Sequence, residues 1–351
     1  MMKAPFLWLA WVTVATAEVE VVAHPAVECA PGKTIVWTAA MQAAFDRLIG
    51  PKSSTPFDRV DPPNPLVARM RDFRWKEEDV LPKDGWFAVA GPSTLELTEQ
   101  ANAKWRKLVG GEGKPFSSGG SGLAAFVGIR RDFLFAKEFA PSGAAKLTWQ
   151  PTGGGVKFFG VKGDASYEFG EQVRVLAFRP SEGTYALQFL SKKGDDTMIL
   201  YLPKEGQPMM EAIRWVETWK RGWGSAEEAK MEWNEKRLHE GDDLRIPEIQ
   251  LDAAQDLGAK FSGNLFFKKS QTPWRVAQAT TSASLGVDAK GVKFQSTAAM
   301  EIRPFGGVTD LQKAFPRRFW FDRPFFLFLW REKAEWPCAA VWFGSVEGLM
   351  K

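Results

Sequence analysis

The chain has 351 residues, of which 45% are hydrophobic and 25% are charged, and its formal net charge is only +4. This composition is that of a globular protein with a core rather than a disordered one, and the basic residues are too evenly mixed with acidic ones to predict a nucleic-acid surface. Only two histidines and two cysteines are present. The usual zinc sites and a serine–histidine–aspartate centre are therefore disfavoured, and we expect no metal, no cofactor and no catalytic centre.

The N-terminus has the layout of a secretory signal peptide. An apolar run follows Lys3 and ends before the small-residue triplet from Ala15 to Ala17. The sequence predicts cleavage after residue 17 and export to a periplasmic or extracellular location, with a buried N-terminal strand as the alternative. No later stretch has 18 uninterrupted apolar residues, so we expect no membrane span.

The first third of the chain predicts few regular elements. Residues 35–38 form a predicted strand, and Ala39 to Leu48 has the spacing of a helix packed on one side. The proline-rich passage from Pro51 to Pro65 favours extended or turn conformations. A second helix is predicted from Thr98 to Leu108, followed by a Gly/Ser-rich loop from Gly110 to Gly122.

The remaining two thirds predict mostly short strands bounded by Gly, Pro or Asp. These strands are 147–149, 156–161, 166–169, 173–178, 185–190, 198–202, 244–251, 265–268, 279–285, 292–302, 319–331 and 339–346. Pro208 to Trp219 is a predicted helix, because its apolar residues recur at helical spacing. A helical minority among many non-repeating strands indicates an α+β protein with helices packed against mixed sheets.

Two patterns come close to functional motifs. Ser121 is one residue short of a nucleophile elbow, because Leu123 occupies the last glycine position, and a hydrolase built on it would lack a base. Trp215, Trp219 and Trp223 could stack on sugars, but their spacing of four residues favours packing against the core.

The C-terminal third carries the most specific motif. Residues 319–329 read FWFDRPFFLFL and resemble the C-terminal signature of the serpin family at every position. The matching residues are Phe319, Phe321, Asp322, Arg323, Pro324 and Phe325. Residues 339–346 resemble the family's last strand, and residues 285–291 resemble the strand and hinge that open a serpin reactive-centre loop. The resemblance covers most of residues 33–351, thinly between 50 and 122.

The resemblance implies a single serpin-like α+β domain over residues 18–351, with mixed β-sheets, packed helices and an exposed reactive-centre loop at about residues 291–318. It implies a secreted monomer that inhibits a serine-type peptidase as a covalent suicide substrate, by inserting its cleaved loop into the main sheet. The loop has the required alternation. From Val292 to Ile302, every second residue is apolar or small, and nearly all the others are polar. An ordinary edge strand would show the same alternation.

The implied hinge consists of Gly291, Val292, Lys293, Phe294 and Gln295. Inhibitory members of the family keep small residues here, and burying Phe294 in a space shaped for alanine would cost roughly 1–3 kcal/mol. The loop also looks longer than is usual in the family. Both departures favour the alternative, a non-inhibitory serpin-like secreted binding protein.

Counting from Gly291 as in the family places the scissile bond between Phe305 and Gly306, which suits a peptidase with a hydrophobic specificity pocket. Arg303 is a second candidate, although Pro304 follows it. Cys29 precedes the first strand of the likeness and Cys338 precedes the last, and the family places these strands side by side. The resemblance therefore implies either a disulfide between Cys29 and Cys338, as an exported protein permits, or two buried thiols.

Overall fold

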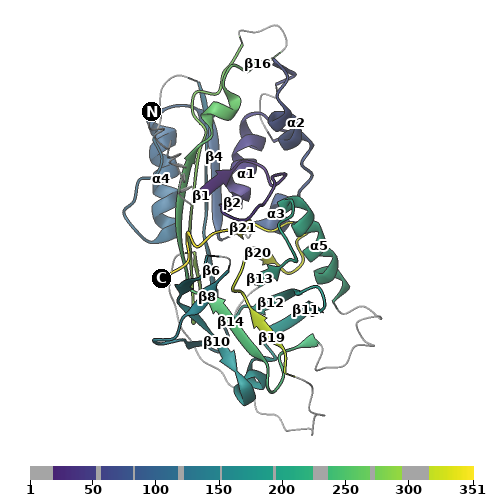
Figure 1. The fold of residues 1–351 in the computed structure, drawn as a ribbon. Coiled ribbons are helices and arrows are strands. Elements are labelled where there is room, and N and C mark those ends of the chain that lie inside the picture. Colours follow the sequence, from purple (N-terminus) through teal and green to yellow (C-terminus); the bar gives the residue numbers. More distant parts are fainter. Residues whose placement is uncertain are drawn as a thin grey trace, which may run out of the picture.

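The computed structural model describes residues 19–52, 57–81, 84–117, 122–150, 152–192, 195–223, 236–268, 273–294 and 316–351. Outside these ranges lie the predicted signal peptide, Ser121, the hinge residue Gln295 and the scissile candidates Arg303, Phe305 and Gly306. Within them, helices pack against several mixed sheets (Figure 1), which confirms the predicted α+β class.

Seven strands form the largest sheet, in the order β1-β2-β21-β20-β13-β12-β11. They span Val19–Val22 (β1), Thr34–Thr38 (β2), Val173–Arg179 (β11), Thr184–Leu190 (β12), Asp196–Leu202 (β13), Phe325–Arg331 (β20) and Ala339–Phe343 (β21). All neighbours are antiparallel except β1 and β2. Strands β20 and β21 are buried almost throughout, so their sequences are nearly continuous apolar runs rather than alternating ones.

Helix α5 (Met209–Gly222) lies beside this sheet and turns one apolar face toward it (Figure 1). Met209, Ile213 and Val216 are buried on that face. Trp215 stacks on Tyr201 of β13, with ring centres 4.4 Å apart. At least this member of the predicted tryptophan row packs against protein, as the spacing indicates.

A smaller antiparallel sheet has the order β15-β17-β18-β6. Its strands span Arg131–Leu134 (β6), Ile249–Asp256 (β15), Thr280–Asp288 (β17) and Gly291–Phe294 (β18). Next to it, β4 (Trp86–Pro92) and β5 (Leu123–Ile129) form an antiparallel pair. Only Arg130 separates β5 from β6, so the pair and the sheet share one extended run of chain.

Two helices cover the β4–β5 pair. Helix α1 (Ala39–Leu48) starts directly after β2 and packs on β5. Its buried Met41 and Phe45 belong to a second core cluster, with Phe57 and Phe266. Helix α4 (Leu95–Val109) packs on both strands. The Thr94 hydroxyl accepts a hydrogen bond from the backbone N–H of Leu97 at 3.2 Å and caps α4, and Gly110, in the left-handed conformation, ends it.

The other elements are short. A four-stranded sheet has the order β19-β14-β10-β7, and two further pairs are β16–β3 and β8–β9. Their bounds are Arg59–Asp61 (β3), Ala140–Pro141 (β7), Leu147–Trp149 (β8), Gly154–Val156 (β9), Phe158–Lys162 (β10), Asp243–Pro247 (β14), Leu265–Phe267 (β16) and Arg318–Trp320 (β19). The short helices are Pro65–Asp72 (α2), Glu77–Val80 (α3), Gly163–Phe169 (η1) and Gly258–Phe261 (η3). No helix in the described ranges is long and apolar enough to cross a membrane.

Several predicted strands differ from the structure. Residues 166–169 were predicted to be a strand but belong to the 3₁₀ helix η1, where the Ser166 hydroxyl donates to the backbone carbonyl of Asp242 at 2.5 Å. The predicted strand 156–161 is divided between β9 and β10, which lie in different sheets. The predicted strand 319–331 is interrupted by the turn at residues 321–324. In the second and third cases, a short segment without strand structure divides a run that looks continuous in the sequence.

Candidate functional site: an open strand position between β5 and β17

The predicted family signature passes from β19 into β20 and comprises Phe319, Phe321, Asp322, Arg323, Pro324 and Phe325. Its three phenylalanines are fully buried. The Arg323 guanidinium donates to the carbonyl of Gly183, which ties the turn to the connection between β11 and β12. These residues therefore hold two sheets together.

Gly291, the predicted hinge glycine, follows the tight turn between β17 and β18. Asp288 Oδ1 accepts hydrogen bonds from the backbone N–H groups of Lys290 at 2.8 Å and Gly291 at 3.3 Å. The φ angle of Gly291 is +152°, and a Cβ at this position would lie 2.2 Å from the carbonyl oxygen of Phe133. Only glycine allows the strands to approach this closely.

Strand β18 lies between β17 and β6. Val292 pairs with Val287 on one side and with Phe133 on the other, and all three side chains are buried. The even-numbered face of the predicted strand therefore points to the core at this position, as the alternation predicts. The pairing extends to Phe294, which is opposite Arg131; of Lys293 and Phe294 only the backbone is described.

Beyond Phe294, two strand edges face an opening. Strand β17 pairs with β15 from Thr280 to Val287, but with β18 only from Gly286 to Asp288. Strand β5 pairs with β4 on one side, and no strand of the described chain pairs with its other side. Such edges present backbone N–H and C=O groups that can bind another strand.

The opening forms a cleft of about 1970 Å³. Residues 122–130, which include β5, line one side, and residues 280–284 of β17 with residues 252–256 of β15 line the other. Met41 and Phe45 of α1 also line the cleft, so apolar side chains form part of it. Because β18 fills the space between β6 and β17, and Arg130 alone joins β6 to β5, the cleft begins at the width of one strand, about 4.8 Å from each neighbour.

Charged groups lie where β18 ends and the cleft begins. The buried Arg131 places Nη2 2.8 Å from Asp196 Oδ1. Partial burial raises the pKa of the Asp132 carboxyl to about 6, and the ion pair with Arg130 at 3.2 Å offsets part of that effect. Two ion pairs therefore lie on and next to the part of β6 that pairs with the end of β18.

The two cysteines are free and buried, so the possible disulfide between Cys29 and Cys338 is not formed. The reason lies in the direction of the strands. Cys29 precedes β2 and Cys338 precedes β21, and these strands pair antiparallel, with Thr34 opposite Phe343 and Thr38 opposite Ala339. The two cysteines therefore lie at opposite ends of the pair, whereas a disulfide requires Cα atoms about 4.4–6.8 Å apart. Burial raises the pKa of both thiols.

The two histidines are both buried, and in the described ranges no group of three or more His, Cys, Asp or Glu side chains could hold a metal ion. His24 Nδ1 accepts a hydrogen bond from the backbone N–H of Ala26 at 3.1 Å. Burial, with a smaller contribution from Arg69, lowers the pKa of His24 to about 4. His239 Nε2 lies 3.3 Å from Asp242, which also binds Arg317. Both rings take part in local packing and polar contacts.

One wall of the cleft was not predicted from the sequence. Residues 123–129 (LAAFVGI) form β5, although the region up to residue 122 looks like a flexible loop. A sequence pattern that indicates a strand was present, because these residues form an uninterrupted apolar run directly before the alternating segment of β6. The segment was overlooked because it directly follows the Gly/Ser-rich stretch that was interpreted as a loop.

No protein-family model matches the sequence, and no curated protein matches it. Among solved structures, the chain is similar to thyroxine-binding globulin in complex with thyroxine, with 16% identity and a TM-score of 0.45 over 76% of this chain and 77% of that one. A second structure, of the human globulin complexed with its ligand, gives 16% identity and a TM-score of 0.43 over the same shares. A serpin from Schistosoma mansoni gives 14% identity and a TM-score of 0.39 over 71% of this chain and 64% of that one. The likeness to these serpin-like structures is one of fold alone.

Proposed function

We propose that this protein is a secreted, monomeric, serpin-like inhibitor of serine peptidases, with no catalytic activity of its own, whose cleaved loop inserts between β5 and β17 and traps the target. The observation that carries the proposal is the position of β18 in the four-stranded sheet. The first residues of the candidate loop already lie in the sheet between β17 and β6, and the cleft between β5 and β17 continues from the point where β18 ends.

The register of β18 supports a longer inserted strand. If the pairing continued along the loop, Ser296 would lie opposite Ala283 on β17 and Ile129 on β5, and Ile302 would lie opposite Leu123 at the start of β5. The predicted alternating strand also ends at Ile302, and Pro304, which has no N–H to donate, follows. The candidate strand would therefore reach the start of β5, whereas β17, which begins at Thr280, could pair with it only as far as Ala299.

A non-inhibitory binding protein is the second candidate function. It is favoured by the buried Val292, which is 1% exposed although the loop has not been cut. An inhibitor requires a hinge that enters the sheet after cleavage, and a hinge that is already seated leaves less of that movement to drive trapping.

Reaction with a panel of serine peptidases tests the proposal. Enzymes that cleave after large apolar residues test Phe305, and enzymes that cleave after arginine test Arg303. We expect a complex that survives SDS gel electrophoresis and an increase in the melting temperature of the cleaved protein, because the new strand pairs the open edges. Cleavage without a complex and without stabilisation would exclude trapping and leave the binding function.

Two neighbouring variants isolate the insertion step. Ser296→Arg places a charge on the face that would be buried by insertion, whereas Thr297→Arg places the same charge on the opposite, outward face. We expect Ser296→Arg to become a cleaved substrate that forms no stable complex, and Thr297→Arg to keep trapping. Equal effects of the two variants would contradict the insertion of this segment as a strand.

A further inference from the structure

Strand β4 leaves one of its two edges without a partner. It pairs antiparallel with β5 along its whole length, from Trp86 to Pro92, and no other strand of the described chain pairs with it. Helices α1 and α4 pack against β4 but do not take the place of a second strand (Figure 1). An edge of this kind presents backbone groups that can pair with another chain.

The hydrogen bonds to β5 show which backbone groups of β4 point outward. The N–H of Arg130 donates to the carbonyl of Gly85 at 2.8 Å, and at the other end the N–H of Ser93 donates to the carbonyl of Gly122 at 2.8 Å. Bonded and non-bonded residues alternate along an antiparallel pair, so the odd-numbered residues of β4 bond to β5 and the even-numbered ones do not. Three N–H and three C=O groups therefore point outward without a partner among the described residues. They belong to Trp86, Ala88 and Ala90.

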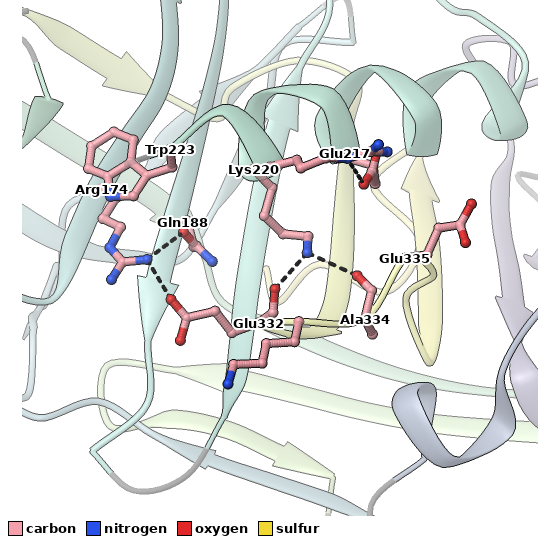
Figure 2. A pocket seen from close by; sticks show the side chains of 10 residues that line it. Arg174, Gln188, Glu217, Lys220, Trp223, Glu332, Ala334 and Glu335 are labelled. Atoms are coloured by element: carbon pink, nitrogen blue, oxygen red, sulfur yellow. Dashed lines mark hydrogen bonds and ion pairs between the residues drawn. The ribbon is translucent and has the colours of Figure 1, made fainter. Parts of the chain in front are cut away.

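The edge of β4 also lacks the features that usually protect an edge strand, which are charged residues, bulges and covering segments. Strand β11, at the edge of the seven-stranded sheet, has all three. Figure 2 shows its Arg174 with the ion pair to Glu332, at 2.8 Å. Arg237 forms an isolated bridge with β11, and a bulge interrupts the pairing of β11 with β12. By contrast, β4 contains no charged residue and no bulge, and only Pro92 at its end lacks an N–H.

We propose that two copies of this chain pair through the free edge of β4, about a twofold axis at Ala88. Antiparallel pairing of the outward groups then places Ala88 opposite Ala88 of the second copy, and Trp86 opposite Ala90 of the second copy. All six outward groups of each strand find a partner in this register. The edge is therefore complementary to itself, as a twofold interface requires, and the two β4–β5 pairs join into one continuous sheet.

The side chains along β4 suit the same register. Phe87 lies opposite Val89 of the second copy, and pairs of an aromatic with a β-branched residue stabilise neighbouring strands. Trp86 lies opposite the small Ala90, so the two large rings do not meet. Because β4 has no charged residue, no like charges lie opposite each other. The side chains therefore favour a second copy as the occupant of this edge.

Helix α4 adds charge complementarity to the proposed pair. Its exposed acidic residues, Glu96 and Glu99, lie in its first half, and its exposed basic residues, Lys104, Arg106 and Lys107, lie in its second half. The helix runs back along β4, because its early residues touch the end of the strand and its late residues touch the start. The twofold axis reverses the second helix, so the acidic end of each α4 lies at the same end of the pair as the basic end of the other.

The proposed pair is weak and leaves the proposed inhibitor monomeric in dilute solution. Two seven-residue strands bury much less surface than a standard interface of about 1,600 Å², so we expect a dissociation constant of about 10–100 µM. The cleft lies on the side of β5 that faces away from β4, and each copy keeps its cleft open. A failure to pair would therefore leave the proposal of peptidase inhibition unaffected.

Sedimentation equilibrium of the full chain, from about 1 µM to about 1 mM, tests the proposal. Ala88→Lys and Ala88→Glu each place two like charges opposite each other at the axis, and each should weaken self-association by about tenfold or more. An equimolar mixture of the two variants should pair at least as well as the original chain. Ala103→Lys is the matched control, because it makes the same change at an exposed position of α4, and it should leave association unchanged. A chain that stays monomeric at about 1 mM, or unchanged association in folded Ala88→Lys, would overturn the proposal.

Amide hydrogen exchange of the original chain provides a second measurement that needs no variant. The N–H groups of Trp86, Ala88 and Ala90 should exchange about tenfold more slowly at about 1 mM than at about 1 µM, because pairing bonds them. The N–H groups of Phe87 and Val89 already bond to β5 and are the internal control. Equal exchange of the three outward groups at both concentrations would overturn the proposal even if the Ala88 variants fail to fold.

Discussion

The seven-stranded sheet and the four-stranded sheet differ in how much of their backbone and side-chain surface is already paired. In the first, β20 and β21 are flanked on both sides and their residues are almost completely buried. In the second, β17 has a partner along only part of one edge, and β5, which belongs to the neighbouring β4–β5 pair, faces the same cleft. The comparison teaches that the recognisable motif and the proposed working part lie in different places: the signature residues stabilise the closed sheet, and the proposed function depends on the open one.

The largest expected contrast between the two regions is in core packing. Trp342→Ala in β21 removes a ring that is 0% exposed and lies 4.5 Å from the ring of Phe326. We expect a loss of about 3–5 kcal/mol in the free energy of unfolding. Val127→Ala in β5, which lines the cleft, should cost about 1 kcal/mol or less. Urea unfolding measures both, and similar losses would contradict the difference between the regions.

A second contrast separates steric fit from backbone strain. Gly291→Ala, at the entry to β18, should cost roughly 2–3 kcal/mol, because its Cβ would collide with the Phe133 carbonyl. Gly32, before β2, has a φ of +97° but no atom within 4 Å of an added Cβ. Gly32→Ala should therefore lower the free energy of unfolding by only about 1 kcal/mol, because it adds backbone strain but no steric clash. Thermal melting of the two variants compares them, and equal costs would mean that the strands can move apart at Gly291.

The next prediction concerns pH at the edge of the closed sheet. The pKa of His24 is lowered to about 4 from 6.5, so between these values the unfolded state binds more protons than the folded state. Stability from this ring is present above about pH 6.5 and is lost as the pH falls toward 4, with about 2 kcal/mol lost by pH 5. His24→Asn, whose side-chain oxygen can accept from Ala26, should flatten this dependence. An unchanged pH profile of the melting temperature would contradict it.

The smallest effect is expected beside the cleft, with the opposite sign. The raised pKa of Asp132, about 6 against 3.8, means that the folded state binds more protons between these values. Stability should therefore fall as the pH rises from about 4 to about 6, by less than about 1 kcal/mol because the carboxyl is partly exposed and screened. Asp132→Asn should remove this slope while leaving the His24 slope in place. Melting curves across the same pH range separate the two.

Much of the fold was predicted from local patterns. The helix Ala39–Leu48 and the strand Leu147–Trp149 have the predicted bounds, because hydrophobic periodicity in these segments agrees with their packing. Helix α2 was missed, although Asn64 caps it and Pro65 occupies a first-turn position that suits proline. The prolines of that region had been interpreted as a sign of extended chain.

The sites depend on contacts that local patterns do not encode. The cleft needs β5 and β17 on its two sides, and these strands are more than a hundred residues apart in sequence. The sequence left a disulfide and two buried thiols open for the same reason, and the structure has the two buried thiols. That β2 and β21 are neighbours could be expected from the resemblance, but strand direction decides which ends meet.

The two free thiols could also show whether the cleft is filled. Cys338 lines the cleft, whereas Cys29 lies at the far end of the same strand pair and is not among the cleft residues. The two buried thiols are therefore a probe and an internal reference for slow chemical labelling. A strand that fills the cleft should slow the chemical modification of Cys338 and leave the rate at Cys29 unchanged. The ratio of the two rates would then report whether the cleft is occupied.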